Sequence, residues 1–204
     1  MRNASDLRPM TVEEYFRFEE RSLIKHEYVS GEVYAMSGAT ARHNTIAGTI
    51  FTRLFTAAED GRCRVFMSDM RVEAAADKYY YPDVVVLCTR IAELDVVARG
   101  PCVVVEVTSP STARIDRGEK LEAYRRIPAL RAYLIVDHRR RRVDRHWRDA
   151  EGGDWLHEEL VAEGRLSIPC LDVELTLDEI YRRVELPAVG EPEAMEYDSV
   201  DFES

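Results

Sequence analysis

The chain has 204 residues, enough for one domain with a sizeable hydrophobic core. Apolar residues make up 46% of it and aromatic residues 9%, which is ordinary for a globular protein. The formal net charge of −10 argues against broad, sequence-independent attraction to nucleic acid, because such binding depends largely on neutralising phosphates. No apolar run approaches the ~20 residues that a membrane helix needs, and the N-terminus lacks the apolar core of a signal peptide. We therefore expect a cytoplasmic protein with no membrane partner.

The cysteines are widely separated along the chain and form no C-x-x-C pair; they are Cys63, Cys88, Cys102 and Cys170. Three of them lie in or beside apolar, strand-like runs, which is typical of buried thiols in a reducing compartment. Their spacing differs from that of structural zinc sites. The sequence therefore predicts buried thiols and argues against a zinc site.

Residues 1–9 predict a disordered lead to a domain that covers residues 10–185. Thr11 can cap a helix over Val12–Arg21, because acidic residues follow it in the first turn. Turn signals and hydrophobic periodicity then predict three elements: two short strands about Ser30-Gly31, a long amphipathic helix from about His43 to Glu59, and a strand over Arg64–Glu73.

Two strongly apolar runs come next. Tyr79–Cys88 predicts the second arm of a long hairpin, and its residues 84–87 are apolar on both faces, as in a covered central strand. The connection 89–100 is expected to be partly helical. The run 101–108 is again apolar except for Glu106, which predicts a second buried strand.

The last part of the domain alternates between helix and strand signals. Asp116 is expected to cap a helix that ends near Arg126. The pattern beyond it predicts strands over Arg131–Asp137, Val143–Trp147 and Trp155–Val161, then a short helix capped by Thr176 and an acidic, disordered tail over 186–204. Together these elements indicate a mixed α/β (α+β) fold around one sheet, with Val103–Thr108 and Tyr133–Val136 as central strands.

Glu106 and Asp83 are the residues that most directly indicate chemistry. Each carboxylate belongs to an apolar, strand-like run, where a buried acid without a partner is unfavourable. Two acids at the ends of neighbouring buried strands can share a divalent cation, and Lys120 follows shortly downstream. The alternative for each acid alone is a turn or cap residue whose hydrogen bonds are satisfied.

A dense basic segment runs from Arg139 to Arg142, with Arg145 and Arg148 beyond it. Such a segment can contact nucleic acid, but a solvated hairpin turn is the interpretation we favour from the sequence alone.

A series of sequence blocks runs through residues 10–184 in this order: TVEEYF, HEYVSGEVYAMSG, RHNTIAG, YPDVVVL, VVVEVTSPSTARIDRGEKLEAY, YLIVD and ELTLDEIY. EVTSPST followed by DRGEKLEAY is the most specific part. Through these blocks the chain resembles the Uma2 family of endonucleases, formerly a domain of unknown function, within the PD-(D/E)XK superfamily. The resemblance implies a restriction-endonuclease-like core, a mixed sheet flanked by helices, and hydrolysis of phosphodiester bonds in nucleic acid, DNA in the first place.

The resemblance also implies residue roles. Asp83 corresponds to the metal-binding aspartate, Glu106 to the acid of the E-x-K element, and the Val107 carbonyl to a further metal ligand. Thr108 stands where the superfamily has a lysine, and Lys120 on the following helix is the displaced lysine that the family pattern implies.

Two earlier residues complete the implied catalytic set. Glu27 resembles the additional acid supplied early in the fold, and His43 matches a family histidine at a helix start that can touch the site or a phosphate. The expected cofactor is Mg²⁺ or Mn²⁺, and the expected partners are nucleic acid and a second copy of the chain.

The implied reaction is metal-assisted hydrolysis, in which the ion polarises the phosphate and activates water while Lys120 orients or stabilises the attacking hydroxide. Two alternatives stay open. One is a nuclease fold that has lost turnover and binds nucleic acid, which Thr108 and the acidic composition favour; the other is a protein-interaction module. A serine or cysteine hydrolase finds no support, because no nucleophile-elbow pattern surrounds Ser109 or Ser111.

Overall fold

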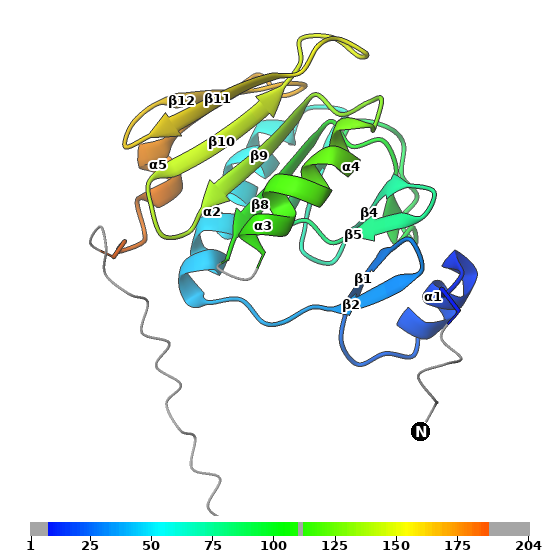
Figure 1. Cartoon of the computed structure of the whole chain (residues 1–204). Helices are drawn as coiled ribbons and strands as arrows, with labels where there is room; N and C mark the ends of the chain where they lie inside the picture. The colour runs from blue at the N-terminus through cyan, green and yellow to red at the C-terminus, as the bar shows by residue number, and fades with distance from the viewer. Residues whose placement is uncertain (1–7, 110–111, 188–204) are drawn as a thin grey trace, which may run out of the picture.

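A six-stranded mixed sheet forms the centre of the computed structural model (Figure 1), which describes residues 8–109 and 112–187. Its central strands β8 and β9 are parallel to each other, and the remaining neighbours pair antiparallel. The strands stand in the order β11 (Leu156–Val161), β10 (Arg142–Trp147), β9 (Ala132–Asp137), β8 (Val103–Thr108), β6 (Val84–Leu87) and β3 (Arg64–Met67). The two predicted central strands are thus confirmed.

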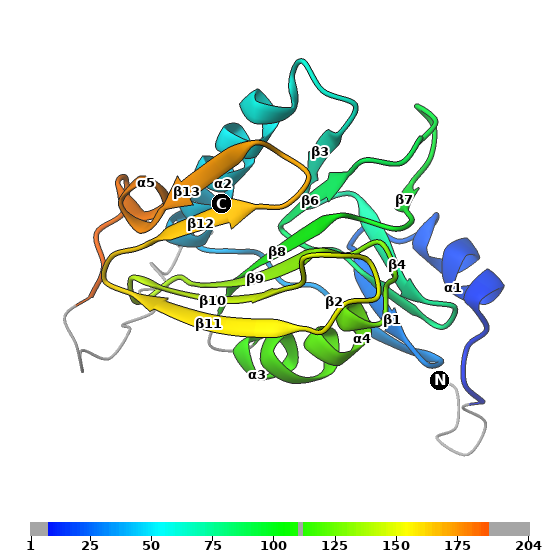
Figure 2. The same cartoon turned by 90° about the horizontal axis from the view of Figure 1, so that it is seen from above.

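Helices cover both faces of this sheet, as Figure 2 shows from above. On one face lie α2 (Ala41–Ala58), α5 (Leu177–Tyr181) and a two-stranded hairpin of β12 (Arg165–Ile168) and β13 (Val173–Thr176). On the other lie α3 (Ala113–Ile115), a π-helical turn (Asp116–Lys120) and α4 (Leu121–Arg125). Because side chains alternate along a strand, three valines of β8 face α2 while Val104 and Glu106 face α4.

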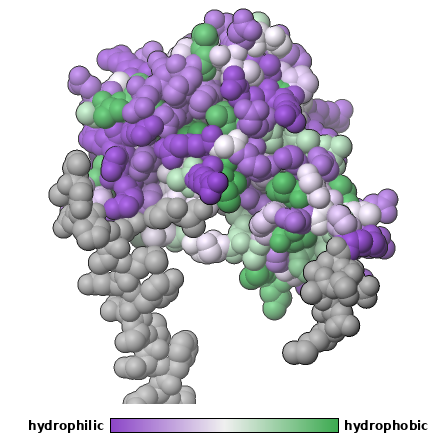
Figure 3. All heavy atoms as spheres, viewed as in Figure 1, coloured by the Kyte–Doolittle hydropathy of each residue, from purple (hydrophilic) through white to green (hydrophobic). Residues whose placement is uncertain are grey.

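A second, five-stranded sheet carries the N-terminal helix. Its order is β2 (Glu32–Ala35), β1 (His26–Val29), β5 (Lys78–Tyr80), β4 (Arg71–Ala75) and β7 (Val97–Ala98). Helix α1 (Val12–Glu19) packs on it through Tyr15, whose ring stacks on Tyr28 at 4.9 Å. Figure 3 shows hydrophobic residues over this end of the molecule and mostly hydrophilic residues over the part above it.

The expectation of a single sheet is wrong, because the chain crosses between two sheets in both arms of the predicted long hairpin. The predicted strand Arg64–Glu73 is interrupted at 68–70, where Ser68 has a φ of 46°. The other arm is interrupted at 81–83, where Pro82 lacks an N–H for strand pairing. Asp83 therefore lies in the crossing segment between the two sheets.

Several local signals are confirmed. Thr11 caps α1 in a capping box with Glu14, and Thr176 caps α5 in the same way with Glu179. The hairpin at Ser30-Gly31 forms as predicted, and the predicted strands Val143–Trp147 and Trp155–Val161 correspond to β10 and β11, which pair antiparallel.

Other local predictions are corrected. The described residues 89–100 contain no helix: they form an open loop, in which Leu94 is 94% exposed, and then the short strand β7. Asp116 is not a cap but lies inside the helical segment, with its side chain buried. The hairpin of β12 and β13 was not predicted, because its residues alternate over only four positions in each strand.

The cysteines also differ from the prediction of buried thiols, since Cys63 is joined to Cys88 and Cys102 to Cys170. Strand pairing, which the spacing along the chain does not reveal, brings these residues together. The predicted lead and tail fall almost entirely outside the described residues. Within the described part of the chain, no helix has the length and apolar character needed to cross a membrane.

Candidate functional site

The pairing of β6 with β8 places Asp83 opposite Glu106. Val84 pairs with Val105, so the residue before Val84 and the residue after Val105 occupy facing positions. The backbone N–H of Val107 donates to Asp83 Oδ2 at 2.7 Å, which fixes one carboxylate against the neighbouring strand. Two residues 23 positions apart in sequence thus reach one end of the sheet.

Glu106 is buried, with a side chain that is only 6% exposed. Its Oε1 accepts hydrogen bonds from Lys120 Nζ at 3.0 Å and from the Tyr124 hydroxyl at 3.1 Å. Burial raises the pKa of Glu106 well above its ordinary value, against the opposing influence of the Lys120 charge. Glu106 therefore has the partners that a buried acid needs, and both Lys120 and Tyr124 come from the next helical segment.

Lys120 connects three acids. Its Nζ lies 2.8 Å from Glu27 Oε1, 3.0 Å from Glu106 Oε1 and 3.6 Å from Asp116 Oδ1. Burial alone would lower the pKa of Lys120, but the three carboxylates, Glu106 foremost, raise it above its ordinary value. The side chain is therefore a protonated donor at neutral pH.

Asp116 is the residue of this cluster that the sequence interpretation missed. It is 1% exposed, burial raises its pKa, and its Oδ1 has no hydrogen-bond partner among the described residues. The π-helical turn places Asp116 and Lys120 on the same side of the segment. The four-residue spacing to Lys120 was the available signal, and the acid was instead read as a helix cap.

His43 orients the remaining acid. The Thr40 hydroxyl caps α2 by accepting from the His43 N–H, and this puts the imidazole at the helix start. Its Nε2 lies 2.8 Å from Asp83 Oδ1. Both oxygens of Asp83 are thus held, one by His43 and one by the backbone of Val107.

All five sequence-derived catalytic candidates therefore gather in one place, and the charges of this cluster are unbalanced. The carboxylates of Asp83, Glu106, Glu27 and Asp116 surround one lysine and one histidine. A divalent cation fits such a set by charge and by donor type, because hard cations take carboxylate and carbonyl oxygens. The described His, Asp and Glu side chains at this place do not bring three ligand atoms within 4.8 Å of one another. An ion here would therefore complete its coordination with the Val107 carbonyl and with water.

A cleft of about 500 Å³ adjoins the acid cluster through Tyr81, whose backbone N–H donates to Glu27. Arg71 lines this cleft and packs on aromatic rings, with its guanidinium carbon 4.9 Å from the Phe16 ring. Its Nε and Nη1 are buried and have no hydrogen-bond partner among the described residues. Lys25 lines the same cleft together with its ion-pair partner Asp69, and Glu19 lines it too, so two acids accompany the two basic side chains.

The arginine-rich segment is largely engaged within the protein. Arg142 contacts Asp144 and Glu159, and Arg145 contacts Glu158. Arg148 is buried and donates to three backbone carbonyls, those of Leu130, Ile127 and Pro128. Of this segment, only residues 139–141 lie in the bend between β9 and β10, so the predicted solvated turn is wrong for Arg142 and Arg145, which belong to β10, and for the buried Arg148.

The fold has a solved counterpart. A crystal structure described as "a putative nuclease belonging to DUF820", from Anabaena variabilis ATCC 29413, superimposes with a TM-score of 0.70. The match covers 85% of this chain and 98% of that chain at 15% sequence identity. The chain therefore has the mixed α/β fold of the DUF820 nuclease-type proteins.

The family follows from the sequence match. The family model named Uma2, described as "Putative restriction endonuclease", matches residues 12–179, and the chain belongs to this family. Two relatives come from Synechocystis sp. (strain ATCC 27184 / PCC 6803 / Kazusa) and are both called uncharacterized proteins. The first, slr1290, is 35% identical over 85% of this chain and 92% of its own length; the second, sll1609, is 34% identical over 76% and 89%.

Proposed function

We propose that this protein is a metal-dependent endonuclease that hydrolyses phosphodiester bonds, with DNA as its substrate. The observation that carries the proposal is the bridge from Lys120 to Glu106 and Glu27, beside Asp83 on the facing strand position. The family description as a restriction endonuclease supports the same reaction class.

In this proposal Asp83, Glu106 and the Val107 carbonyl hold Mg²⁺ or Mn²⁺. When bound, the ion supplies charge stabilisation at the scissile phosphate and lowers the pKa of a bound water. Lys120 remains protonated, so it donates a hydrogen bond to the attacking oxygen rather than removing its proton. Its position 12 residues after Thr108 provides the charge that the E-x-K element lacks at Thr108.

The remaining residues position these groups. His43 holds Asp83, Tyr124 holds Glu106, and Glu27 holds Lys120. Arg71 in the adjoining cleft, whose Nε and Nη1 have no hydrogen-bond partner among the described residues, would offer a contact to a substrate phosphate, which an acidic protein needs to bind DNA. A homodimer, which would present two such sites to two strands, stays a prediction.

The test is a cleavage assay on double- and single-stranded DNA and on RNA, with Mg²⁺, Mn²⁺ or EDTA. The variants are Asp83→Asn, Glu106→Gln and Lys120→Arg. Each should lower metal-dependent cleavage at least about 100-fold, the scale of removing one electrostatic contact in an active site. Glu122→Gln, an exposed change on the same helix, should cleave as the wild type does.

Equal cleavage by wild type and by the Asp83→Asn/Glu106→Gln double variant would end the proposal. The alternative is a nuclease fold without turnover, which the three ion pairs of Lys120 favour because they occupy the proposed donor. Calorimetry separates the two: metal and oligonucleotide binding without cleavage by the wild type would select the alternative.

A further inference from the structure

The four cysteines lie together at the end of the six-stranded sheet opposite to the acid cluster. In β3 and β6, Arg64 pairs with Leu87, so Cys63 and Cys88 face each other just beyond the two strands. Cys102 immediately precedes β8, and its backbone N–H donates to the Val86 carbonyl at 2.7 Å. Three adjacent strand ends therefore each present one sulfur at the same edge.

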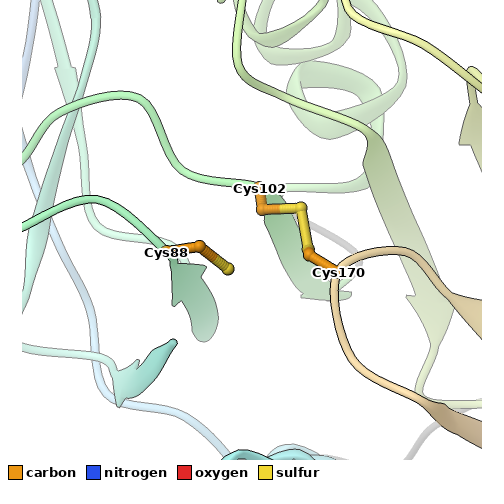
Figure 4. Close-up of side chains that lie close together, drawn as sticks. All are labelled: Cys88, Cys102 and Cys170. Atoms are coloured by element: carbon orange, nitrogen blue, oxygen red, sulfur yellow. A yellow bond between two sulfur atoms is a disulfide. The ribbon is translucent and has the colours of Figure 1, made fainter. Parts of the chain in front are cut away.

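The fourth sulfur comes from a distant segment. Cys170 lies between β12 and β13, whose apolar residues Leu166 and Leu175 pack in the same core cluster as Cys63 and Cys102. Figure 4 shows the Cys88 side chain pointing toward the bonded pair of Cys102 and Cys170. The Sγ atoms of these three residues all lie within 4.8 Å of one another, and Cys63 is bonded to Cys88.

The spacing of these three sulfurs is close to that of thiolates around a tetrahedral metal ion. Zinc binds thiolates at about 2.3 Å in a tetrahedron, which places the sulfurs about 3.8 Å apart. The sulfurs of Cys88, Cys102 and Cys170 would have to approach one another by up to about 1 Å to reach that geometry, and Cys63 Sγ, which lies outside this group of three, would have to move toward them after its bond to Cys88 is reduced. Tetrahedral sites of four sulfurs are typical of zinc and of iron–sulfur centres. A single ion needs sulfurs about 3.8 Å apart, the spacing given above for zinc.

Exposed basic residues stand near two of the cysteines in the sequence. Arg62 and Arg64 flank Cys63, and Arg90 lies two residues beyond Cys88. The two buried cysteines limit access of water, while Cys170 is exposed and provides an entry path.

We propose that Cys63, Cys88, Cys102 and Cys170 bind one structural Zn²⁺ ion when their thiols are reduced, and that the two disulfides are the metal-free, oxidised form of this site. Each disulfide takes up two electrons and two protons to give two thiols. A dithiol supplies both and becomes a disulfide itself, whereas a phosphine supplies the electrons and becomes the phosphine oxide, with water as the source of the oxygen and the protons. Zn²⁺ binding then releases one proton from each thiol. The ion joins the ends of three strands to the β12–β13 hairpin.

This site is separate from the acid cluster. Asp83 and Cys88 stand at opposite ends of β6, five residues apart, which corresponds to about 17 Å along a strand. Zinc at the cysteines should therefore act on stability rather than on the chemistry proposed for the acids. The inference does not depend on the proposed endonuclease activity.

The test is the zinc content of protein purified with a phosphine reductant in the absence of oxygen. We expect about one zinc per chain, retained in Asp83→Asn/Glu106→Gln, which excludes binding at the acids. Cys170→Ser and Cys102→Ser should lose it. Ser167→Ala, an exposed change in the same hairpin, should keep it. Removal of zinc by a chelator should lower the melting temperature of the wild type and of Ser167→Ala, but not that of Cys170→Ser.

A titration with Co²⁺ covers the case in which the cysteine variants fail to fold. Reduced wild-type protein should develop thiolate-to-cobalt charge-transfer absorption and the visible bands of a tetrahedral ion, and Zn²⁺ should abolish both. Reduced protein that takes up less than about a tenth of an equivalent of zinc, zinc retained by Cys170→Ser, or iron in place of zinc would each overturn the proposal.

Discussion

Lys120 is the residue on which the acid cluster depends most. It is the ammonium group that faces Glu106, Glu27 and Asp116, and its side chain is 6% exposed. Removing one partner of a buried ion pair leaves an uncompensated charge, which is far less favourable than losing an exposed pair. The stability of the fold and the proposed chemistry therefore share one side chain.

Lys120→Met should lower the free energy of unfolding by about 3–5 kcal/mol at pH 7, the range for breaking a buried pair. Urea unfolding followed by circular dichroism measures this change. Lys25→Met is the matched control, because Lys25 makes an exposed pair with Asp69 and should contribute less than about 1 kcal/mol. Similar effects for the two variants would mean that the carboxylates near Lys120 do not depend on its charge.

At the residue scale, the sequence predicted most residues of the acid cluster, but it did not predict which of them contact one another. Asp83 and Glu106 could be selected because acids in apolar runs need partners, and Lys120 through the family pattern. Asp116 was missed because it was interpreted as a helix cap, although its four-residue spacing to Lys120 places both on one side of the helical segment. Arg71 was missed because its aromatic neighbours come from α1 and from the crossing segment at Tyr81.

At the scale of elements, the π-helical turn contains Gly118 in a backbone conformation that other residues also adopt. Gly118 is exposed, and a Cβ built there meets no atom within 4 Å. Gly118→Ala should therefore raise the free energy of unfolding by about 0.4–1 kcal/mol, because alanine has less conformational freedom in the unfolded chain. Thermal and urea unfolding check this.

Gly31→Ala is the opposite case and serves as the comparison. Gly31 has a φ of +97°, and an added Cβ would overlap Pro9 Cβ. This variant should be destabilised, since alanine disfavours that backbone conformation and the turn cannot shift without moving Pro9. Equal stability of the two alanine variants would contradict the backbone assignment at one of the two positions.

The strand pair β10–β11 carries a pH-dependent contribution. His146 stacks on the opposite His157 at 4.4 Å, and burial, with help from His157 and Arg125 and against Asp144, lowers the pKa of His146 to about 4. Between pH 6.5 and about 4 the unfolded chain binds a proton at this residue that the folded chain does not. Stability from this residue is therefore lost as the pH falls through that window.

His146→Gln should accordingly show a smaller loss of unfolding free energy between pH 7 and pH 4.5 than the wild type does. Urea unfolding at the two pH values measures the difference. His157→Gln should reduce the loss only in part, because burial is the larger cause of the lowered pKa. A wild-type pH profile that His146→Gln leaves unchanged would show that His146 is protonated in the folded state.

Helices and strands were predictable where capping residues or apolar runs mark them in the local sequence. The pairing of the strands was not predictable. Capping residues located α1 and α5, and the uniformly apolar runs located β6 and β8. The division into two sheets was not predictable, because it depends on which strands pair across the breaks at 68–70 and 81–83. The same long-range pairing decides where the cysteines meet.

At the scale of the whole molecule, charge is unevenly distributed. Residues 188–204 contain six acidic and no basic residues, so their removal changes the formal net charge from −10 to −4. Truncation after residue 187 should therefore tighten DNA binding at low salt, with a difference that shrinks as salt rises.

Fluorescence anisotropy with a labelled duplex at two salt concentrations measures this effect. A full-length variant with the six acids changed to their amides separates charge from chain length, and it should bind as the truncated protein does. Equal affinity of all three proteins at low salt would mean that the charge of this segment does not act at the DNA-binding surface.

The two ends of the paired strands β6 and β8 differ in whether they can accept an insertion. The acids occupy one end, and the loop that carries Leu94 leaves from the other, beyond Cys88. Because the facing positions of Asp83 and Glu106 are set by strand pairing and not by that loop, its length is free to vary. A fluorescent label or peptide tag inserted at Leu94 would thus report on the folded protein without entering the acid cluster.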